Sequence, residues 1–113
     1  MTINNEIPRD QWKDFFVTFS RGNSGRLLSI EIFDVESGDL GAKNQGKLMA
    51  VDYDPVGKGN DIVVTTGVDE IGYSHTISAP TEVWKAQHEN GEISALEIID
   101  QNNVKTILSL KSS

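Results

Sequence analysis

The chain has 113 residues, of which 37% are hydrophobic, and it carries a formal net charge of −7. It contains no cysteine, which excludes disulfide bonds and thiolate-bound zinc or iron–sulfur sites. The length is typical of one domain, so we expect residues 1–113 to form a single domain.

The N-terminal residues show neither a basic segment nor an apolar segment of the kind found in secretory signals. The apolar runs of the chain are far shorter than the roughly 18 residues that a membrane-spanning helix needs. Together with the absence of cysteine, these features favour a protein of the cytoplasm.

The first predicted element is a helix over residues 8–21. Pro8 suits the first helical position, where its missing N–H has no partner to lose. Four aromatic residues recur at the spacing of one helix face: Trp12, Phe15, Phe16 and Phe19. Gly22 is expected to end the helix, because glycine readily takes the left-handed conformation found there. The aromatic stripe should face the core.

After residue 25 the hydrophobic period changes from that of a helix to two, which indicates strands. Residues 34–46 are polar and rich in glycine, and they are expected to form a long loop. Asn90-Gly91 predicts a hairpin with a type I′ turn, in which both residues have positive φ. The expected strands are 26–33, 47–53, 61–66, 73–78, 81–88, 92–100 and 104–110.

These elements predict an α+β fold. Strands joined by short turns run antiparallel, and one helix cannot cover both faces of a large sheet. We therefore expect the N-terminal helix to pack on a curled, mostly antiparallel sheet of about six to seven strands, shaped as a half-barrel or barrel.

The excess negative charge is concentrated in the middle of the chain. Residues 31–70 contain nine acidic residues and three lysines, a balance of −6 within the total of −7. This field repels phosphate groups, so nucleic acid and anionic membranes are not expected partners. A divalent cation or a basic protein surface is the kind of partner that it attracts.

The sequence gives little support for catalysis, and we expect a protein that is not an enzyme. Cysteine is absent, and Ser24 lies outside a nucleophile-elbow motif. Neither a phosphate-binding glycine loop nor a pair of histidines at metal-ligand spacing is present. His75 and His88 are isolated, and such histidines are more often structural than catalytic.

Acidic loops remain as candidate binding sites. Calcium takes six to eight hard oxygen ligands, which flexible loops with carboxylates and glycine can supply. The EF-hand pattern fails, because Gly38 and Val56 occupy the fifth positions counted from Asp34 and Asp52. Solvated loops without a ligand explain the same pattern. The candidate metal ligands are Asp34, Glu36, Asp39, Asp52, Asp54, Asp61, Asp69 and Glu70.

The opening residues Ile7-Pro8-Arg9, followed by Trp12, Phe15 and Phe16, resemble the start of a small bacterial family of unknown function whose members begin I-P-R-x-x-W-x-x-F-F. The length, the acidity and the lack of an EF-hand also resemble the cyanobacterial calcium-binding protein CcbP. This second resemblance implies a cytoplasmic calcium binder or buffer with carboxylate loops.

Two functional hypotheses follow. The first is a non-catalytic acidic protein, a calcium buffer or sensor, that binds Ca²⁺ through these loops. The alternative is an interaction module, or adaptor, whose acidic face holds a basic protein without any metal.

Overall fold

The computed structural model describes residues 2–34, 39–68 and 71–111. Helix α1 (Trp12–Asn23) follows the first strand and the short 3-10 helix η1 (Arg9–Gln11), and a second 3-10 helix, η2 (Val56–Lys58), follows β3. The strands are β1 (Thr2–Ile7), β2 (Leu27–Asp34), β3 (Asp39–Asp54), β4 (Asp61–Val68), β5 (Ile71–Ser78), β6 (Pro80–His88), β7 (Ile93–Asp100) and β8 (Val104–Leu110). No helix within the described ranges is long and apolar enough to cross a membrane.

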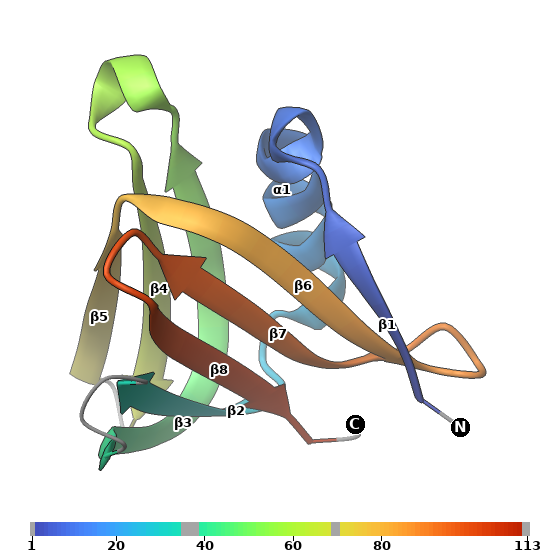
Figure 1. The fold of residues 1–113 in the computed structure, drawn as a ribbon. Coiled ribbons are helices and arrows are strands. Elements are labelled where there is room, and N and C mark those ends of the chain that lie inside the picture. The colour runs from blue at the N-terminus through green and yellow to red at the C-terminus, as the bar shows by residue number, and fades with distance from the viewer. Residues whose placement is uncertain (1, 35–38, 69–70, 112–113) are drawn as a thin grey trace.

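All the strands belong to one antiparallel sheet with the order β1-β6-β7-β8-β2-β3-β4-β5 (Figure 1). The predicted α+β class, with one N-terminal helix on an antiparallel sheet, is confirmed. The predicted number of six to seven strands is too low, because the described residues form eight. The sheet is also not closed into a barrel, since β1 and β5 lie at its two ends.

The curled sheet encloses the hydrophobic core together with α1. Trp12, Phe16 and Phe19 are each no more than 2% exposed, and Phe15 packs beside them, as the aromatic stripe predicted. They belong to one buried cluster with aliphatic residues from both halves of the sheet, such as Val64 and Leu96. Burial of side chains of this size contributes roughly 1.5–3 kcal/mol each, so the stripe fixes α1 against the sheet.

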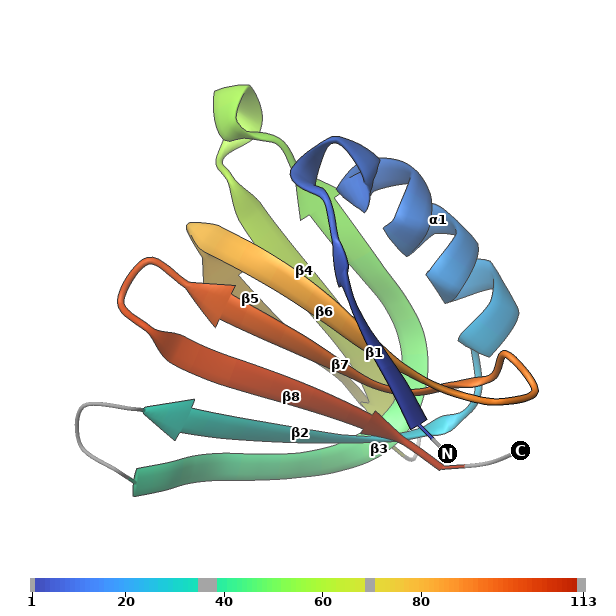
Figure 2. The same ribbon diagram turned by 45° about the vertical axis from the view of Figure 1, so that its right-hand side comes forward.

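Strand β3 changes its neighbour along its length. Residues 39–47 pair with β2 on one edge, whereas residues 47–54 pair with β4 on the other. A register shift between Leu48 and Ala50 marks the change, and Figure 2 shows β3 curving at this level to run beside α1. A β-bulge of this kind bends a strand locally. The second half of β3 therefore has an edge that no strand covers.

Helix α1 covers that edge. The Ser20 hydroxyl accepts a hydrogen bond from the Val51 N–H at 2.9 Å and donates one to the Val51 carbonyl at 3.1 Å. Beyond the helix, the Gly25 N–H donates to the Leu48 carbonyl, and the Leu48 N–H donates to the Arg26 carbonyl. The backbone polar groups of Leu48 and Val51 on the β3 edge are thus satisfied without a neighbouring strand.

Two local predictions about turns are wrong. The helix does not end at Gly22 but continues to Asn23, and the positive φ of 89° falls on Gly25. The hairpin at Asn90-Gly91 is present, but only Gly91 has a positive φ, of 90°. The Gly91 N–H donates to the His88 carbonyl, and the loop spans residues 89–92. A four-residue loop does not need the type I′ geometry of a two-residue one.

A sharp corner joins the two halves of the sheet where β5 passes into β6. Ala79 alone separates the strands and has a φ of 52°, and its N–H donates to the Asn60 carbonyl. Arg9 stabilises this corner. Its guanidinium donates a hydrogen bond to the Pro80 carbonyl at 2.7 Å and lies 4.4 Å from the ring centroid of Trp12. The corner is thereby tied to the start of α1.

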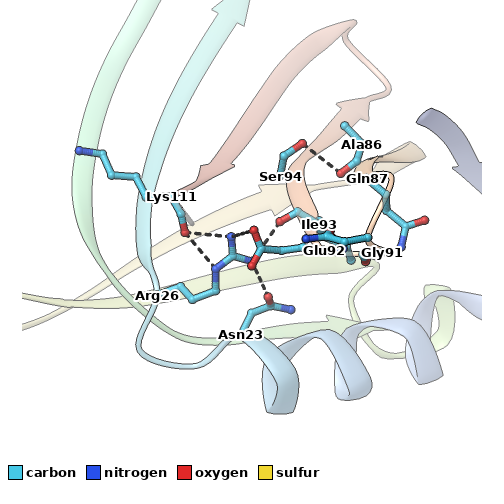
Figure 3. Close-up of polar contacts among 10 residues, drawn as sticks. Asn23, Arg26, Ala86, Gln87, Gly91, Glu92, Ile93, Ser94 and Lys111 are labelled. Carbon is cyan, nitrogen blue, oxygen red and sulfur yellow. Dashed lines mark hydrogen bonds and ion pairs between the residues drawn. The ribbon is translucent and has the colours of Figure 1, made fainter. Parts of the chain in front are cut away.

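A second arginine joins three segments at the other end of the helix (Figure 3). The Arg26 guanidinium donates to Asn23 Oδ1 and to the Ile93 carbonyl from Nη1, and to the Lys111 carbonyl from Nε and Nη2. Its Nη2 also lies 3.6 Å from Glu92 Oε1, and its side chain is only 8% exposed. Arg26 therefore connects the end of α1, the β6–β7 hairpin and the residue after β8.

We expect Arg26→Ala to lower the free energy of unfolding by about 2–4 kcal/mol, because it leaves two part-buried acceptors, the Ile93 carbonyl and Asn23 Oδ1, without their charged donor. Chemical denaturation monitored by circular dichroism measures the change. The matched control is Lys105→Met, which removes an exposed ion pair with Glu97 and should cost less than about 1 kcal/mol. Equal losses in the two variants would contradict the role assigned to Arg26.

Candidate functional site

The β3–β4 hairpin gathers three of the acidic residues that the sequence predicted. Asp52 and Asp54 are exposed and lie two residues apart, so they project from one face of β3. Asp61 is directly opposite Asp54 in the register and lies on the same face. Like charges in direct cross-strand opposition destabilise a sheet. This end of the hairpin thus gathers three carboxylates, and the connecting η2 contributes one base, Lys58.

The structure does not neutralise the first two of these carboxylates internally. Neither Asp52 nor Asp54 makes a side-chain hydrogen bond or an ion pair with any other residue in the described ranges. Both remain available to a cation that approaches from solvent.

A groove lies beside these carboxylates, where α1 meets the edge of β3. Its volume is about 470 Å³. Phe16 and Val17 of α1 and Val63 of β4 give it apolar walls, and Val17 is 47% exposed. The remaining lining residues are Lys13, Val51, Asp52, Tyr53 and Asp54. The groove therefore combines an apolar surface with two carboxylates at its rim.

Sequence reasoning found the acids of this groove but not its apolar part. Val17 and Val63 were not predicted to contribute to a site. The available signal was Val17, which is an apolar residue outside the aromatic stripe of the helix.

The other predicted ligands are placed elsewhere or lie outside the described ranges. Asp34 pairs in register with Asp39 at the far end of β3, and only the backbone of Asp39 is described. Glu36, Asp69 and Glu70 are not among the described residues. The structure thus brings Asp52, Asp54 and Asp61 to one end of β3 and leaves Asp34 at the other.

No group of three or more His, Asp or Glu side chains close enough to hold a metal ion occurs among the residues with described positions. The same-face carboxylates of β3 and β4 therefore do not form a preassembled metal centre within that part of the chain. The predicted calcium site stays a prediction.

A second hollow, of about 330 Å³, lies between α1 and the β6–β7 hairpin and is lined by Phe15, Phe19, Ile93 and Arg26, among others. A buried arginine beside a hollow can indicate an anion site. Here each guanidinium nitrogen already donates to an oxygen at 2.7–3.0 Å. A guanidinium has five N–H groups, so little donor capacity is left for a ligand. Arg26 has a structural role.

The two histidines lie apart from the groove. His75 is half-buried on β5, opposite the fully buried Val64, and burial lowers its pKa below the usual value of 6.5. His88 is exposed at the end of β6. Neither residue lines the groove or the hollow beside Arg26.

The lowered pKa of His75 predicts a loss of stability in acid. The folded protein holds His75 neutral at a pH where the unfolded chain already binds a proton, so the free energy of unfolding falls as the pH drops below about 6.5. His75→Gln should make the decrease between about pH 7.5 and about pH 5 shallower, measured by urea unfolding. His88→Gln is the matched control, and a slope unchanged in His75→Gln would contradict the assignment.

Comparisons with known proteins identify relatives but no activity. An uncharacterized protein of Aquifex aeolicus (strain VF5) is 29% identical over 105 residues, which cover 93% of this chain and 89% of that protein. No solved structure matches the chain. The model of a family of unknown function, DUF5335, matches residues 3–113. The expected membership in a family of unknown function is thereby confirmed, whereas these findings support neither the opening motif I-P-R-x-x-W-x-x-F-F as a mark of that family nor the resemblance to CcbP. The chain belongs to the DUF5335 family.

Proposed function

We propose that this protein is a non-catalytic binding protein whose groove between α1 and β3 receives a basic segment of a partner protein. The observation that carries the proposal is the position of Asp52 and Asp54 at the rim of an apolar groove, where neither makes an ion pair with a described residue and Lys13 is the one base that lines the groove. Lysine and arginine place an aliphatic stem on apolar surface while the charged end reaches an anion. The groove offers both surfaces side by side.

The overall charge supports the same partner. The chain carries −7, with −6 in residues 31–70, and this region includes both rim carboxylates. A field of one sign speeds the approach of an oppositely charged surface and disfavours surfaces of like charge. The groove adds a local apolar contact that distinguishes a basic segment carrying aliphatic residues from one that is only charged.

Titration of isotope-labelled protein with two capped pentapeptides tests the proposal. One alternates valine or leucine with lysine, and the other replaces each lysine with glutamine. The lysine peptide should shift the amide resonances of Lys13, Val17, Asp52 and Asp54, and the glutamine peptide should bind much more weakly. Since exposed ion pairs contribute roughly 0.2–1 kcal/mol each, Asp52→Asn with Asp54→Asn should weaken binding about fivefold.

The matched control is Glu6→Gln with Glu89→Gln, which makes the same change in charge at exposed positions outside the groove. This variant should bind the lysine peptide within about twofold of the original protein, because distant exposed charges are largely screened at physiological salt. Equal weakening by both double variants, or equal binding of both peptides, would refute the groove as the binding site.

Calcium binding is the second candidate, and the register of β3 favours it. The first and last residues of β3 are aspartates, and each lies opposite another aspartate: Asp39 pairs with Asp34, and Asp54 pairs with Asp61. A divalent cation between such residues would relieve the repulsion.

Calorimetry of chelator-stripped protein measures calcium binding directly. Saturation at 100 times the dissociation constant should raise the free energy of unfolding by about 2.7 kcal/mol, and magnesium should bind more weakly. Asp54→Asn with Asp61→Asn should abolish binding at that end of β3 and stabilise the metal-free protein. No heat at about 5 mM CaCl₂, with a melting shift no larger than NaCl of equal ionic strength produces, would refute calcium binding.

A further inference from the structure

The outer edge of β5 is an unusual feature of the sheet. β5 stands last in the strand order, and β4 is its one partner among the described strands. Eight successive residue pairs join the two strands without a register shift. In an antiparallel pair, alternate residues direct their N–H and C=O groups away from the partner. β5 therefore presents an uninterrupted row of backbone donors and acceptors.

Proteins usually protect such an edge with lysine or other charged residues, proline, a bulge or a covering segment. Residues 71–78 contain no lysine, arginine, aspartate, glutamate or proline, and their pairing with β4 has no bulge. The opposite edge strand, β1, differs because it is shorter, contains Glu6 and leads into Pro8. The two ends of the sheet are thus unequal, and β5 is the one suited to accept another strand.

The charge of the molecule decides which strand fits. The chain carries −7, yet β5 contains no formally charged residue at neutral pH apart from the histidine, His75, which its lowered pKa keeps neutral. A basic partner gains nothing from this strand, because it has no carboxylate to meet. An identical strand places no like charges opposite each other. Antiparallel pairing of two identical edges has two-fold symmetry, which closes the assembly at a dimer.

We propose that β5 is a self-association edge, where two copies of this chain pair antiparallel and continue the sheet from one copy into the other. The outward face of β5 carries the exposed side chains Ser74, Thr76 and Ser78, which suit a hydrated β surface. Tyr73, which is 44% exposed, adds apolar area on the other face. The proposal is independent of the groove, whose lining residues belong to α1, β3 and β4.

The salt dependence of this association has a defined sign. Two bodies of charge −7 repel each other at a distance, and added salt screens the repulsion. Hydrogen bonds between strands and apolar contacts are not screened in this way. The dimer should therefore strengthen as salt increases, whereas binding of a basic peptide to the groove should weaken. Failure of one proposal leaves the other testable.

Sedimentation velocity of the full chain, from about 10 µM to about 1 mM, tests the proposal at about 50 and about 500 mM NaCl. A monomer–dimer equilibrium with a larger association constant at high salt is expected. Ser74→Lys with Thr76→Lys should lower that constant at least about fivefold, because lysines then face each other across the edge. The charge-matched control, Thr18→Lys with Asn102→Lys at exposed positions, should still dimerise.

The geometry can be tested separately, because the chain has no cysteine and accepts single spin labels cleanly. Eight paired strand residues span roughly 27 Å, so labels on Ser74→Cys should lie within about 30 Å of each other in the dimer. Labels on Thr18→Cys should lie farther apart. A monomer under all conditions, a lysine variant that dimerises as the original does, or a dimer with distant Ser74 labels would overturn the proposal.

Discussion

The constraint on which the rest of this structure depends is the exchange of neighbours along β3. One edge of this strand is paired with β2 up to Lys47 and is then covered by α1, with Ser20 taking the place of a strand at Val51. The aromatic stripe of α1 holds the helix at that edge from the core side. If the helix lay elsewhere, the exposed amide and carbonyl of Val51 would lack partners, and the curl of the sheet would leave the core open.

The groove exists because a helix, and not a strand, covers this edge of β3. A neighbouring strand lies about 4.8 Å away and would cover the edge of β3 evenly, whereas a helix with its side chains is about 10 Å across. A helix that covers a strand edge therefore cannot pack closely against the side chains on both faces of the sheet. Val17 and Val63 therefore stay partly exposed beside Asp52 and Asp54. The feature that completes the fold also produces its most promising binding surface.

Much of the fold could be predicted from period and turn residues, and the failures have physical causes. Trp12, Phe16 and Phe19 identified the packed helix face because three- and four-residue spacing has one structural meaning. Residues 39–46 were expected to be a loop because they are mostly polar and contain two glycines. In the structure they pair with β2 and form the first half of β3. β1 contains three successive polar residues, Asn4, Asn5 and Glu6, so its sequence carries no alternating apolar pattern. The acids at the rim were visible, but which of them share a face depended on the β3–β4 register.

The place of β8 in the sheet has a consequence for how the protein forms. This strand lies between β7 and β2 and is the one described strand that pairs with both the group β1-β6-β7 and the group β2-β3-β4-β5. Hairpins such as β4–β5 can pair as soon as they emerge from the ribosome, but the two groups cannot join until residues 104–110 are available. Thr2 of β1 likewise cannot pair with β6 until its partner His88 has been synthesised. Such pairings between residues far apart in the sequence slow folding, and the continuous sheet forms only after the early hairpins have been joined by them.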